Sequence, residues 1–332
     1  MPLYNKAAYV KKALNSVVAQ TCSDWELIVV DDGSTDESAT VVTEWLQVLY
    51  HKGTIGKAVT GYRLQGDYFV HAQHPHIKVI RQPNQGVSVA RNNGVAASAG
   101  NYVCFLDADD WWAPAFLEEM KKLIIGFPEA GIYAAAYYYH KNNRDEVRMN
   151  VPTGYINYFA EYAKGGAMPL GTGAVCVPRA VFDECGGFKP GIKLGEDFLL
   201  WVTIAMAHKV AFLMKPLAYY NQDVEAATRG IGRLHKPAEH MLWNLQPFRN
   251  LEQENADFKR LIDSLRVSGL RRYWLSKEYH LAAETELQKV DWNRQPAKVR
   301  NWYRTPLWLL QIHAAAMHVG SVCKQTLIRL IR

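Results

Sequence analysis

The stretch NYVCFLDADDWWAP, residues 101–114, joins an apolar run to three closely spaced aspartates, two tryptophans and a proline. The apolar run predicts a short buried strand that ends at Asp107. Asp107 and Asp109 have the Asp-x-Asp spacing, which places both carboxylates on the same edge of an extended segment. We expect Asp110 to cap a following helix whose first turn carries Pro114.

Paired aspartates at the end of a strand suit a hard divalent cation. Mg²⁺ or Mn²⁺ prefers one or two carboxylates together with phosphate oxygens and water. Aspartates also commonly end a strand and begin a turn. Taken alone, the spacing therefore fits either a metal site or a turn.

The segments before this stretch alternate between helix and strand. Helical spacing of apolar residues predicts helices over 6–19 and 86–100, and apolar runs predict strands over 27–30 and 77–81. Such alternation favours an α/β fold in which helices flank a mostly parallel sheet. Ligands of such sheets bind at the carboxyl ends of the strands.

A second acidic pair, Asp31 and Asp32, follows the first of these strands. Gly33 permits a turn, and Ser34 with Glu37 matches a capping box for the next helix. Because both acidic clusters stand at carboxyl ends of strands, both are candidates for one binding site.

Residues 51–76 are polar and contain glycine and histidine, so we expect an insertion between a helix and the strand at 77–81. The spacing of His71, His74 and His76 fits no compact metal site. These side chains are therefore expected at the surface.

Beyond Pro114 we predict a helix to about residue 125, a tyrosine-rich strand over 131–140 and a helix over 196–207. Two carboxylates begin the last helix, where they fit either chemistry or a helix-dipole interaction of about 0.3–1 kcal/mol. After residue 235 the mixture of Trp, Leu, Arg and Lys predicts mainly helices, so a domain boundary is expected there.

Composition excludes several classes of protein. The 332 residues are 49% hydrophobic and 21% charged, which is typical of a globular protein, and no run reaches the ~20 apolar residues of a membrane span. The first residues do not match a secretory signal. Five scattered cysteines without a C-x-x-C pair disfavour disulfides and zinc, and we expect a cytoplasmic protein.

The formal charge of +6 is concentrated in residues 290–332, which hold seven Lys or Arg and one Asp. We expect a partner such as anionic lipid rather than nucleic acid, although a solvated helix face explains the charge equally well. Residues 304–332 predict one helix with mostly apolar faces. It either packs on the catalytic domain or lies in a membrane interface, helped by Arg304, Lys324 and Arg329.

Five motifs occur in series: PLYNKAAYV, ELIVVDDGSTD, NQGVSVARNNG, FLDADDWW and GEDFLLW. In this order and approximate spacing they resemble family 2 glycosyltransferases over roughly residues 1–220. The resemblance implies a GT-A fold, an α/β fold with a mostly parallel, Rossmann-like sheet. We expect a catalytic domain over 1–234, with a nucleotide-sugar half over about 1–112 and an acceptor half over about 113–234, and a helical region over 235–332.

The resemblance also implies roles on the nucleotide side. Pro2 and Tyr4 would line the nucleobase pocket, and Asp32 would bind the base with support from Asp31. Arg91 would help to orient the nucleotide. Each has a plainer alternative, because Tyr4 could pack, Arg91 could be a solvated helix residue and Asp31 could cap the turn at Gly33.

For the chemistry, the resemblance implies Mg²⁺ or Mn²⁺ ligated by Asp109, with Asp107 near the ribose and the metal. The base would be Asp197, with Glu196 orienting the acceptor. Such a carboxylate takes the proton of the acceptor hydroxyl, and the metal stabilises the departing nucleoside diphosphate. Basic residues of a later loop would contact the diphosphate: Arg229 and Arg233.

The implied activity is inverting transfer of a sugar, with a UDP-sugar as the default donor, to a glycan or lipid-linked acceptor in cell-surface polysaccharide synthesis. Its place would be the cytoplasm, as a peripheral protein at the inner face of the membrane. A nucleotidylyltransferase would need an early glycine-rich phosphate loop with a basic residue, and the sequence contains none. A non-catalytic glycan-binding or scaffold protein of the same fold stays open.

One departure from the family concerns the start of the chain. Family members carry a buried strand immediately before the Pro-Leu-Tyr-Asn stretch, where this chain has only Met1. We expect the first strand to be missing, which would leave a gap and unpaired backbone groups beside the strand at 27–30. The gene product would then begin upstream, or this chain would be less stable.

Overall fold

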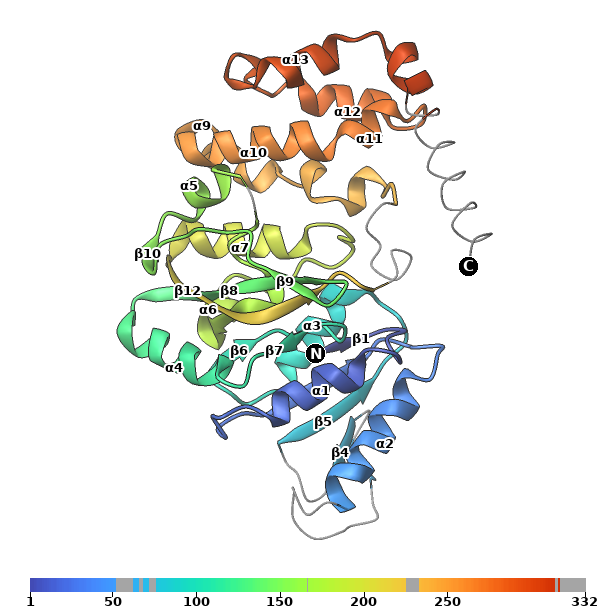
Figure 1. Cartoon of the computed structure of the whole chain (residues 1–332), viewed down its shortest axis with the longest axis vertical. Coiled ribbons are helices and arrows are strands. Elements are labelled where there is room, and N and C mark those ends of the chain that lie inside the picture. Colours follow the sequence, from blue (N-terminus) through green and yellow to red (C-terminus); the bar gives the residue numbers. More distant parts are fainter. Residues whose placement is uncertain are drawn as a thin grey trace. The chain divides into compact units, whose positions relative to one another are not determined.

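The computed structural model describes residues 1–51, 62–65, 68–71, 76–165, 167–224, 233–313 and 316. The chain divides into two compact units, Met1–Met241 and Leu242–Arg332. Figure 1 shows that the first unit contains the sheets and that the second is built from helices.

A five-stranded sheet begins the first unit, with the strand order β1-β2-β5-β4-β3. Its bounds are β1 Pro2–Leu3, β2 Leu27–Asp31, β5 Ile77–Arg81, β4 Tyr68–His71 and β3 Tyr62–Gln65. The first three strands are parallel, and β3 and β4 form an antiparallel hairpin on the edge of β5. The insertion expected over residues 51–76 is present between α2 and β5, and this hairpin within it extends the sheet.

Three helices accompany this sheet: α1 Val10–Val18, α2 Ser38–His51 and α3 Val87–Ala96. Helix α1 begins four residues later than predicted because the backbone N–H of Lys6 donates to Ser38 Oγ (2.7 Å) and that of Ala7 to Asp36 Oδ2 (3.1 Å). The capping-box prediction is wrong for a related reason. Ser34 Oγ accepts from Asn5 N (3.1 Å), so it binds another loop instead of starting α2.

The second sheet has the strand order β10-β12-β8-β11-β6. Its bounds are β10 Gly154–Ile156, β12 Lys209–Asn221, β8 Ala130–Lys141, β11 Val175–Pro178 and β6 Tyr102–Cys104, with β7 Trp111–Trp112 on β12 and β9 Arg144–Glu146 on β8. The long strands β8 and β12 are parallel. Both faces of β8 are buried over most of its length, and several of its buried side chains are small alanines. Associated helices are α4 Phe116–Gly126, α5 Tyr158–Ala163, α6 Arg179–Glu184, α7 Glu196–Ala207 and the 3₁₀ turns η1 Thr172–Ala174 and η2 Pro237–Glu239.

Asp110 does not cap a helix, which corrects a prediction. Helix α4 starts only at Phe116, and no side chain caps it. The residues after Asp110 instead form β7, so Asp110 is buried and its Oδ1 accepts from the backbone N–H of Asn221 on β12 (2.8 Å). The strand pairing of the two tryptophans therefore decides where this carboxyl lies.

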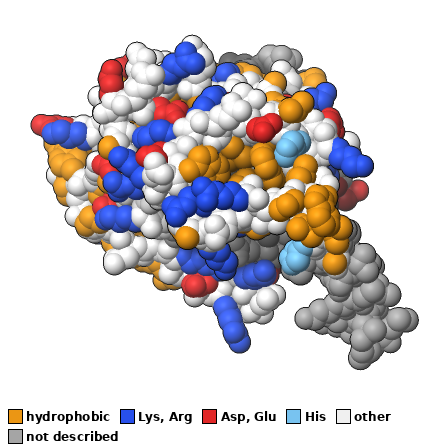
Figure 2. All heavy atoms as spheres, turned by 90° about the horizontal axis from the view of Figure 1, so that it is seen from above, with side chains coloured by type: hydrophobic (Ala, Val, Ile, Leu, Met, Phe, Trp, Pro, Cys, Tyr) orange, Lys and Arg blue, Asp and Glu red, His pale blue; other side chains and the backbone are white. Residues whose placement is uncertain are grey.

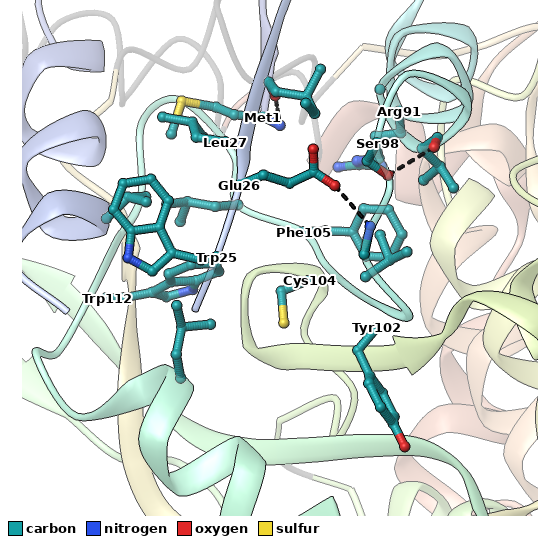
Figure 3. A pocket seen from close by; sticks show the side chains of 18 residues that line it. Met1, Trp25, Glu26, Leu27, Arg91, Ser98, Tyr102, Cys104, Phe105 and Trp112 are labelled. Carbon is teal, nitrogen blue, oxygen red and sulfur yellow. Dashed lines mark hydrogen bonds between the residues drawn. The ribbon is translucent and has the colours of Figure 1, made fainter. Parts of the chain in front are cut away.

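A two-residue strand, β1, is present where we expected none. It pairs with the carboxyl end of β2, and the amine of Met1 donates to Ile28 O (2.8 Å). Beside the other end of β2 lies a cavity of about 170 Å³ whose walls include Trp25, Phe105 and Trp112 (Figure 3).

The second unit is helical, as predicted. Its helices are α9 Arg249–Glu254, α10 Ala256–Gly269, α11 Arg271–Leu275, α12 His280–Leu287 and α13 Ala297–Arg304, with short 3₁₀ turns η4 Gln246–Phe248 and η5 Trp292–Arg294; η3 Met241–Trp243 joins the units. Buried Arg266 contacts the carboxylates of Glu252, Asp263 and Glu286. Lys259 and Lys289 pair with the same carboxylates, so three positive and three negative groups balance within the unit.

The predicted single helix over 304–332 is interrupted at its start. Helix α13 ends at Arg304, and residues 307–313 form a separate helical stretch after Pro306. Most of the remaining predicted helix, with Lys324 and Arg329, lies outside the described residues. Within the described part of the chain, no helix combines the length and the apolar character that crossing a bilayer requires.

Candidate active site

One cavity of the first unit gathers side chains from β8, β12, α3, α7 and the loop after β6. Its volume is about 370 Å³. The residues around it include Arg91, Asp107, Asp110, Tyr137, Tyr139, Thr172, Lys193, Glu196, Asp197, Tyr219 and Tyr220. Four residues that the motifs singled out, Arg91, Asp107, Glu196 and Asp197, therefore surround one space.

Arg91 joins two of the motifs. Its Nη1 donates to Glu196 Oε1 and its Nη2 to Asp107 Oδ1, both at 2.8 Å, and the guanidinium lies over the ring of Phe188. Burial opposes the positive charge, but the two carboxylates raise the pKa of Arg91 above its ordinary value. The side chain is buried, which excludes the alternative of a solvated helix residue. Arg91 thus fixes the carboxylates of α7 relative to the Asp-x-Asp loop.

The two acids at the start of α7 have different partners. Burial and the neighbouring Asp197 raise the pKa of Glu196, while Arg91 acts in the opposite direction. Asp197 Oδ2 accepts a hydrogen bond from Thr172 Oγ1 (2.8 Å). A full positive charge therefore holds Glu196, whereas a neutral hydroxyl orients Asp197.

Thr172 is a site residue that sequence reasoning missed. It lies between Gly171 and Gly173 and is the first residue of the turn η1. A Cβ at Gly171 would stand 2.7 Å from Tyr137 Cε1, so only glycine allows this turn to approach β8. The only signal in the sequence was a threonine between two glycines. That pattern indicated a tight turn, but it did not indicate a contact with Asp197.

The Asp-x-Asp loop presents its carboxylates differently. Asp107 lines the cavity and is 32% exposed. Asp109 Oδ2 is 2.6 Å from Lys6 Nζ, and these side chains are 14% and 13% exposed. Burial, then Asp109 and Asp107, raise the pKa of Asp110 well above its usual range, which favours its neutral form. Lys6 is a second contact that sequence reasoning missed.

The oxygen donors of Asp107 and Asp109 suit Mg²⁺ or Mn²⁺, which keeps most of its coordination for water and phosphate. Among the described residues, no group of three or more His, Cys, Asp or Glu side chains is arranged to hold an ion. The donor set therefore fits a cation held by two carboxylates and a diphosphate, provided that Lys6 gives way at Asp109.

Asp31 and Asp32 hold the backbone at the end of β2. Asp31 Oδ1 accepts from Ser34 N (2.9 Å), which is the turn-capping role. Asp32 accepts from Gln82 Nε2, Gln85 N and Gly86 N, each at 2.8 Å. Both carboxylates are buried. Through these hydrogen bonds they hold the loops that follow β2 and β5 in place.

Of the other predicted nucleotide contacts, Pro2 lies in β1 and Tyr4 is 46% exposed on the following loop. That loop is tied to the next motif, because Asn5 Oδ1 accepts from Thr35 N (2.8 Å). Arg233 is exposed, and Arg229 lies outside the described residues.

Curated relatives match part of the chain. It is 29% identical over 234 residues to the glycosyltransferase GlyA of Streptococcus pneumoniae, a match that covers 66% of this chain and 30% of the relative. It is 41% identical over 117 residues to an uncharacterized glycosyltransferase of Nostoc sp., covering 35% of this chain and 29% of the relative. The matches thus span about 30% of the length of these curated relatives.

Solved structures share the fold. TarS 1–349 of S. aureus, in complex with UDP-GlcNAc, aligns with a TM-score of 0.56 at 17% identity, covering 86% of this chain and 68% of that one. The mannosyltransferase PcManGT of Pyrobaculum calidifontis, in complex with GDP-Man and Mn²⁺, gives 0.54 at 16% identity, covering 97% and 84%.

Residues 1–186 match the sequence model of Glycosyl transferase family 2. This match covers more than half of the chain and includes four of the five motifs. The chain belongs to glycosyl transferase family 2 and has the GT-A fold, an α/β fold with a helical C-terminal region.

Proposed function

We propose that this chain is an inverting glycosyltransferase. It transfers a sugar from a nucleoside diphosphate donor, a UDP-sugar by default, to a hydroxyl of a glycan or lipid-linked glycan acceptor. The observation that carries the proposal is the cavity in which Asp197 and Asp107 lie together, with Arg91 joining α7 to the loop after β6.

In this proposal Asp197 is the general base. It takes the proton of the acceptor hydroxyl while the oxygen attacks the anomeric carbon on the face opposite the diphosphate, so the configuration inverts. The hydroxyl of Thr172 orients the Asp197 carboxylate. Glu196 is held by Arg91 and helps to orient the acceptor.

On the donor side, Asp107 and Asp109 would hold a divalent cation, which when bound neutralises the diphosphate of the leaving group. Pro2, Tyr4 and Asp32, with support from Asp31, would contact the nucleobase. The diphosphate contacts would be Arg229 and Arg233. The complexes of TarS with UDP-GlcNAc and of PcManGT with GDP-Man and Mn²⁺ support a nucleotide-sugar donor and a metal cofactor, Mg²⁺ or Mn²⁺.

We further propose a role in cell-surface polysaccharide synthesis at the inner, cytoplasmic face of a membrane. Apolar side chains of the second unit support peripheral binding, since Trp308 and Ile312 are exposed. Figure 2 shows apolar side chains beside Lys and Arg on one face of the molecule. Apolar groups next to basic residues are typical of segments that lie in a membrane interface.

The test is a donor screen with the full chain, following hydrolysis or transfer from nucleotide sugars with Mg²⁺ or Mn²⁺. We expect Asp197→Ala and Asp197→Asn to lower the transfer rate by roughly 10²–10⁴-fold, the usual contribution of a general base. Asp109→Ala should raise the metal concentration needed for half-maximal rate. Asp183→Asn, an exposed acid on α6, is the matched control.

The alternatives give different results. A non-catalytic scaffold would bind glycans but turn over no donor. A nucleotidylyltransferase would instead release diphosphate from a nucleoside triphosphate. Wild-type rates in both the Asp109 and Asp197 variants would reject the assigned roles.

A further inference from the structure

The face of the sheet that lines the active-site cavity carries tyrosines. In the parallel pairing of β8 and β12, Tyr139 stands opposite Tyr220 and Tyr137 opposite Ala218. Successive side chains of a strand point to opposite faces, so Tyr137, Tyr139 and Tyr220 share one face and Tyr138 lies on the other. The absence of a ring at Ala218 leaves room between these tyrosines.

Tyr138 and Tyr219, whose side chains lie on the opposite face, have a structural role, although Tyr219 also borders the cavity. Tyr138 stacks on Tyr219 with ring centroids 4.9 Å apart, and Tyr219 stacks on Trp111 at 5.0 Å. This stack joins β8, β12 and β7. Tyr138 does not line the cavity, so it is a matched control for its neighbour Tyr139.

The hydroxyls on the cavity face form a directed chain. Tyr137 donates its only proton to Met168 O (2.9 Å), so in its 3.1 Å contact with Tyr139 the donor is Tyr139. The oxygen of Tyr139 therefore keeps acceptor capacity. The ring of Tyr220 meets that of Tyr139 edge to face, with centroids 5.8 Å apart. Together they offer aromatic surface and a hydroxyl acceptor in the cavity that contains Asp197.

The charges around the cavity disfavour an anionic ligand on this side. Of the described residues that line it, the cations are Arg91, bound to two carboxylates, and Lys193, bound to Glu239 Oε1 (2.8 Å). They face the carboxyl groups of Asp107, Asp110, Glu196 and Asp197. Arg148 lies over the ring of Tyr139 at 4.5 Å, and it too pairs with a carboxylate, that of Glu146.

We propose that Tyr139 and Tyr220 form the acceptor subsite, and that the reacting unit of the acceptor is an uncharged hexopyranoside rather than a phosphorylated polyol. A pyranose ring has apolar C–H faces that pack on aromatic rings and hydroxyls at its edge that suit phenol and carboxylate partners. A ring seated there places a hydroxyl in the same cavity as Asp197. The inference rests on the proposed function and adds the acceptor class.

The test measures binding and turnover separately. Saturation-transfer NMR on the full chain, without donor, would give dissociation constants for para-nitrophenyl hexopyranosides and for glycerol 3-phosphate. We expect a pyranoside to bind, and Tyr139→Leu and Tyr220→Leu each to weaken binding on the order of tenfold. Tyr138→Leu should stay within about twofold of wild type. With the donor found in the screen, the two cavity variants should also lower the ratio of transfer to hydrolysis.

Three results would overturn the subsite: binding of glycerol 3-phosphate but of no pyranoside, unchanged affinity in both cavity variants, or an equal loss in Tyr138→Leu. A different failure concerns the proposed function. If the chain binds pyranosides through Tyr139 and Tyr220 but hydrolyses no nucleotide sugar, the subsite stands and the transferase proposal falls.

Discussion

Lys6 places an ammonium on a carboxylate that we propose as a metal ligand. The two groups are 2.6 Å apart and largely shielded from water, so their attraction is only weakly screened. An ammonium and a divalent cation compete for the same oxygen. We expect Lys6→Met to lower the dissociation constant for Mn²⁺ on the order of tenfold, or about 1.4 kcal/mol, as measured by electron paramagnetic resonance of free Mn²⁺ without nucleotide.

Two companion variants make that measurement specific. Lys11→Met removes an exposed charge from α1 and should leave the Mn²⁺ affinity unchanged. Lys6→Arg keeps the charge and should bind Mn²⁺ no more tightly than wild type. Weaker Mn²⁺ binding in Lys6→Met would mean that Lys6 supports the site instead of competing for it.

At the level of residues, the motifs predicted which side chains meet but not what fixes them. Asp107 follows β6 and Glu196 begins α7, and Arg91, in the middle of α3, binds both. The partners Thr172 and Lys6 reach their acids across 25 and 103 residues of chain. Such contacts depend on how loops fold back, and no local pattern in the sequence encodes them.

The turn that begins α7 depends on a returning segment of chain. Lys193 N donates to Glu239 O (2.7 Å), and Met241 N donates to Leu194 O (2.9 Å). Gly195 has a left-handed φ of 82°, which allows the chain to turn directly before Glu196. His240, in the middle of the returning segment, is 2% exposed. The start of α7 is thus anchored around a buried histidine.

Burial, and then the nearby His235, lower the pKa of His240 to about 4 from 6.5. Between these pH values the unfolded chain binds a proton that the folded chain does not, so the unfolding free energy falls as the pH drops through this window. The contribution is up to about 3 kcal/mol. We expect urea denaturation from pH 7 to 4 to show a shallower loss of stability in His240→Leu than in wild type.

Exposed His76 supplies the control for that experiment, because His76→Leu should keep the wild-type pH dependence. Equal slopes in all three proteins would contradict the role of His240. Carboxylates also titrate below pH 5, so the difference between variants carries the argument.

At the level of elements, hydrophobic periodicity predicted β5, β8 and α7 closely. It failed at the start of α1, where the backbone of Lys6 and Ala7 binds side chains of another loop. It also failed for Asp110, which follows a strand but is buried against β12. Long-range hydrogen bonds override local propensity at these positions.

For the whole molecule, the order of the motifs predicted the fold because each motif stands where a strand or helix ends. The hairpin β3–β4 was hidden, since its segment is polar overall and its pairing partner β5 lies beyond it in the chain. The chain divides at Met241 and Leu242. The position of that division depends on which residues pack together in three dimensions. The change in composition near residue 235 does not carry this information.

The second unit leads to a prediction about membranes. Trp308 and Ile312 are each 61% exposed, and α13 just before them carries Lys298, Arg300 and Arg304. Apolar insertion and attraction to anionic headgroups act together at such sites. We expect the full chain to co-sediment with phosphatidylglycerol vesicles. The double variant Trp308→Asp, Ile312→Asp should lower the partition coefficient between vesicles and water on the order of tenfold or more. Ile125→Asp changes an isoleucine of α4 that is even more exposed, at 72%, and should have no such effect. Equal loss in both variants would reject this surface as the contact.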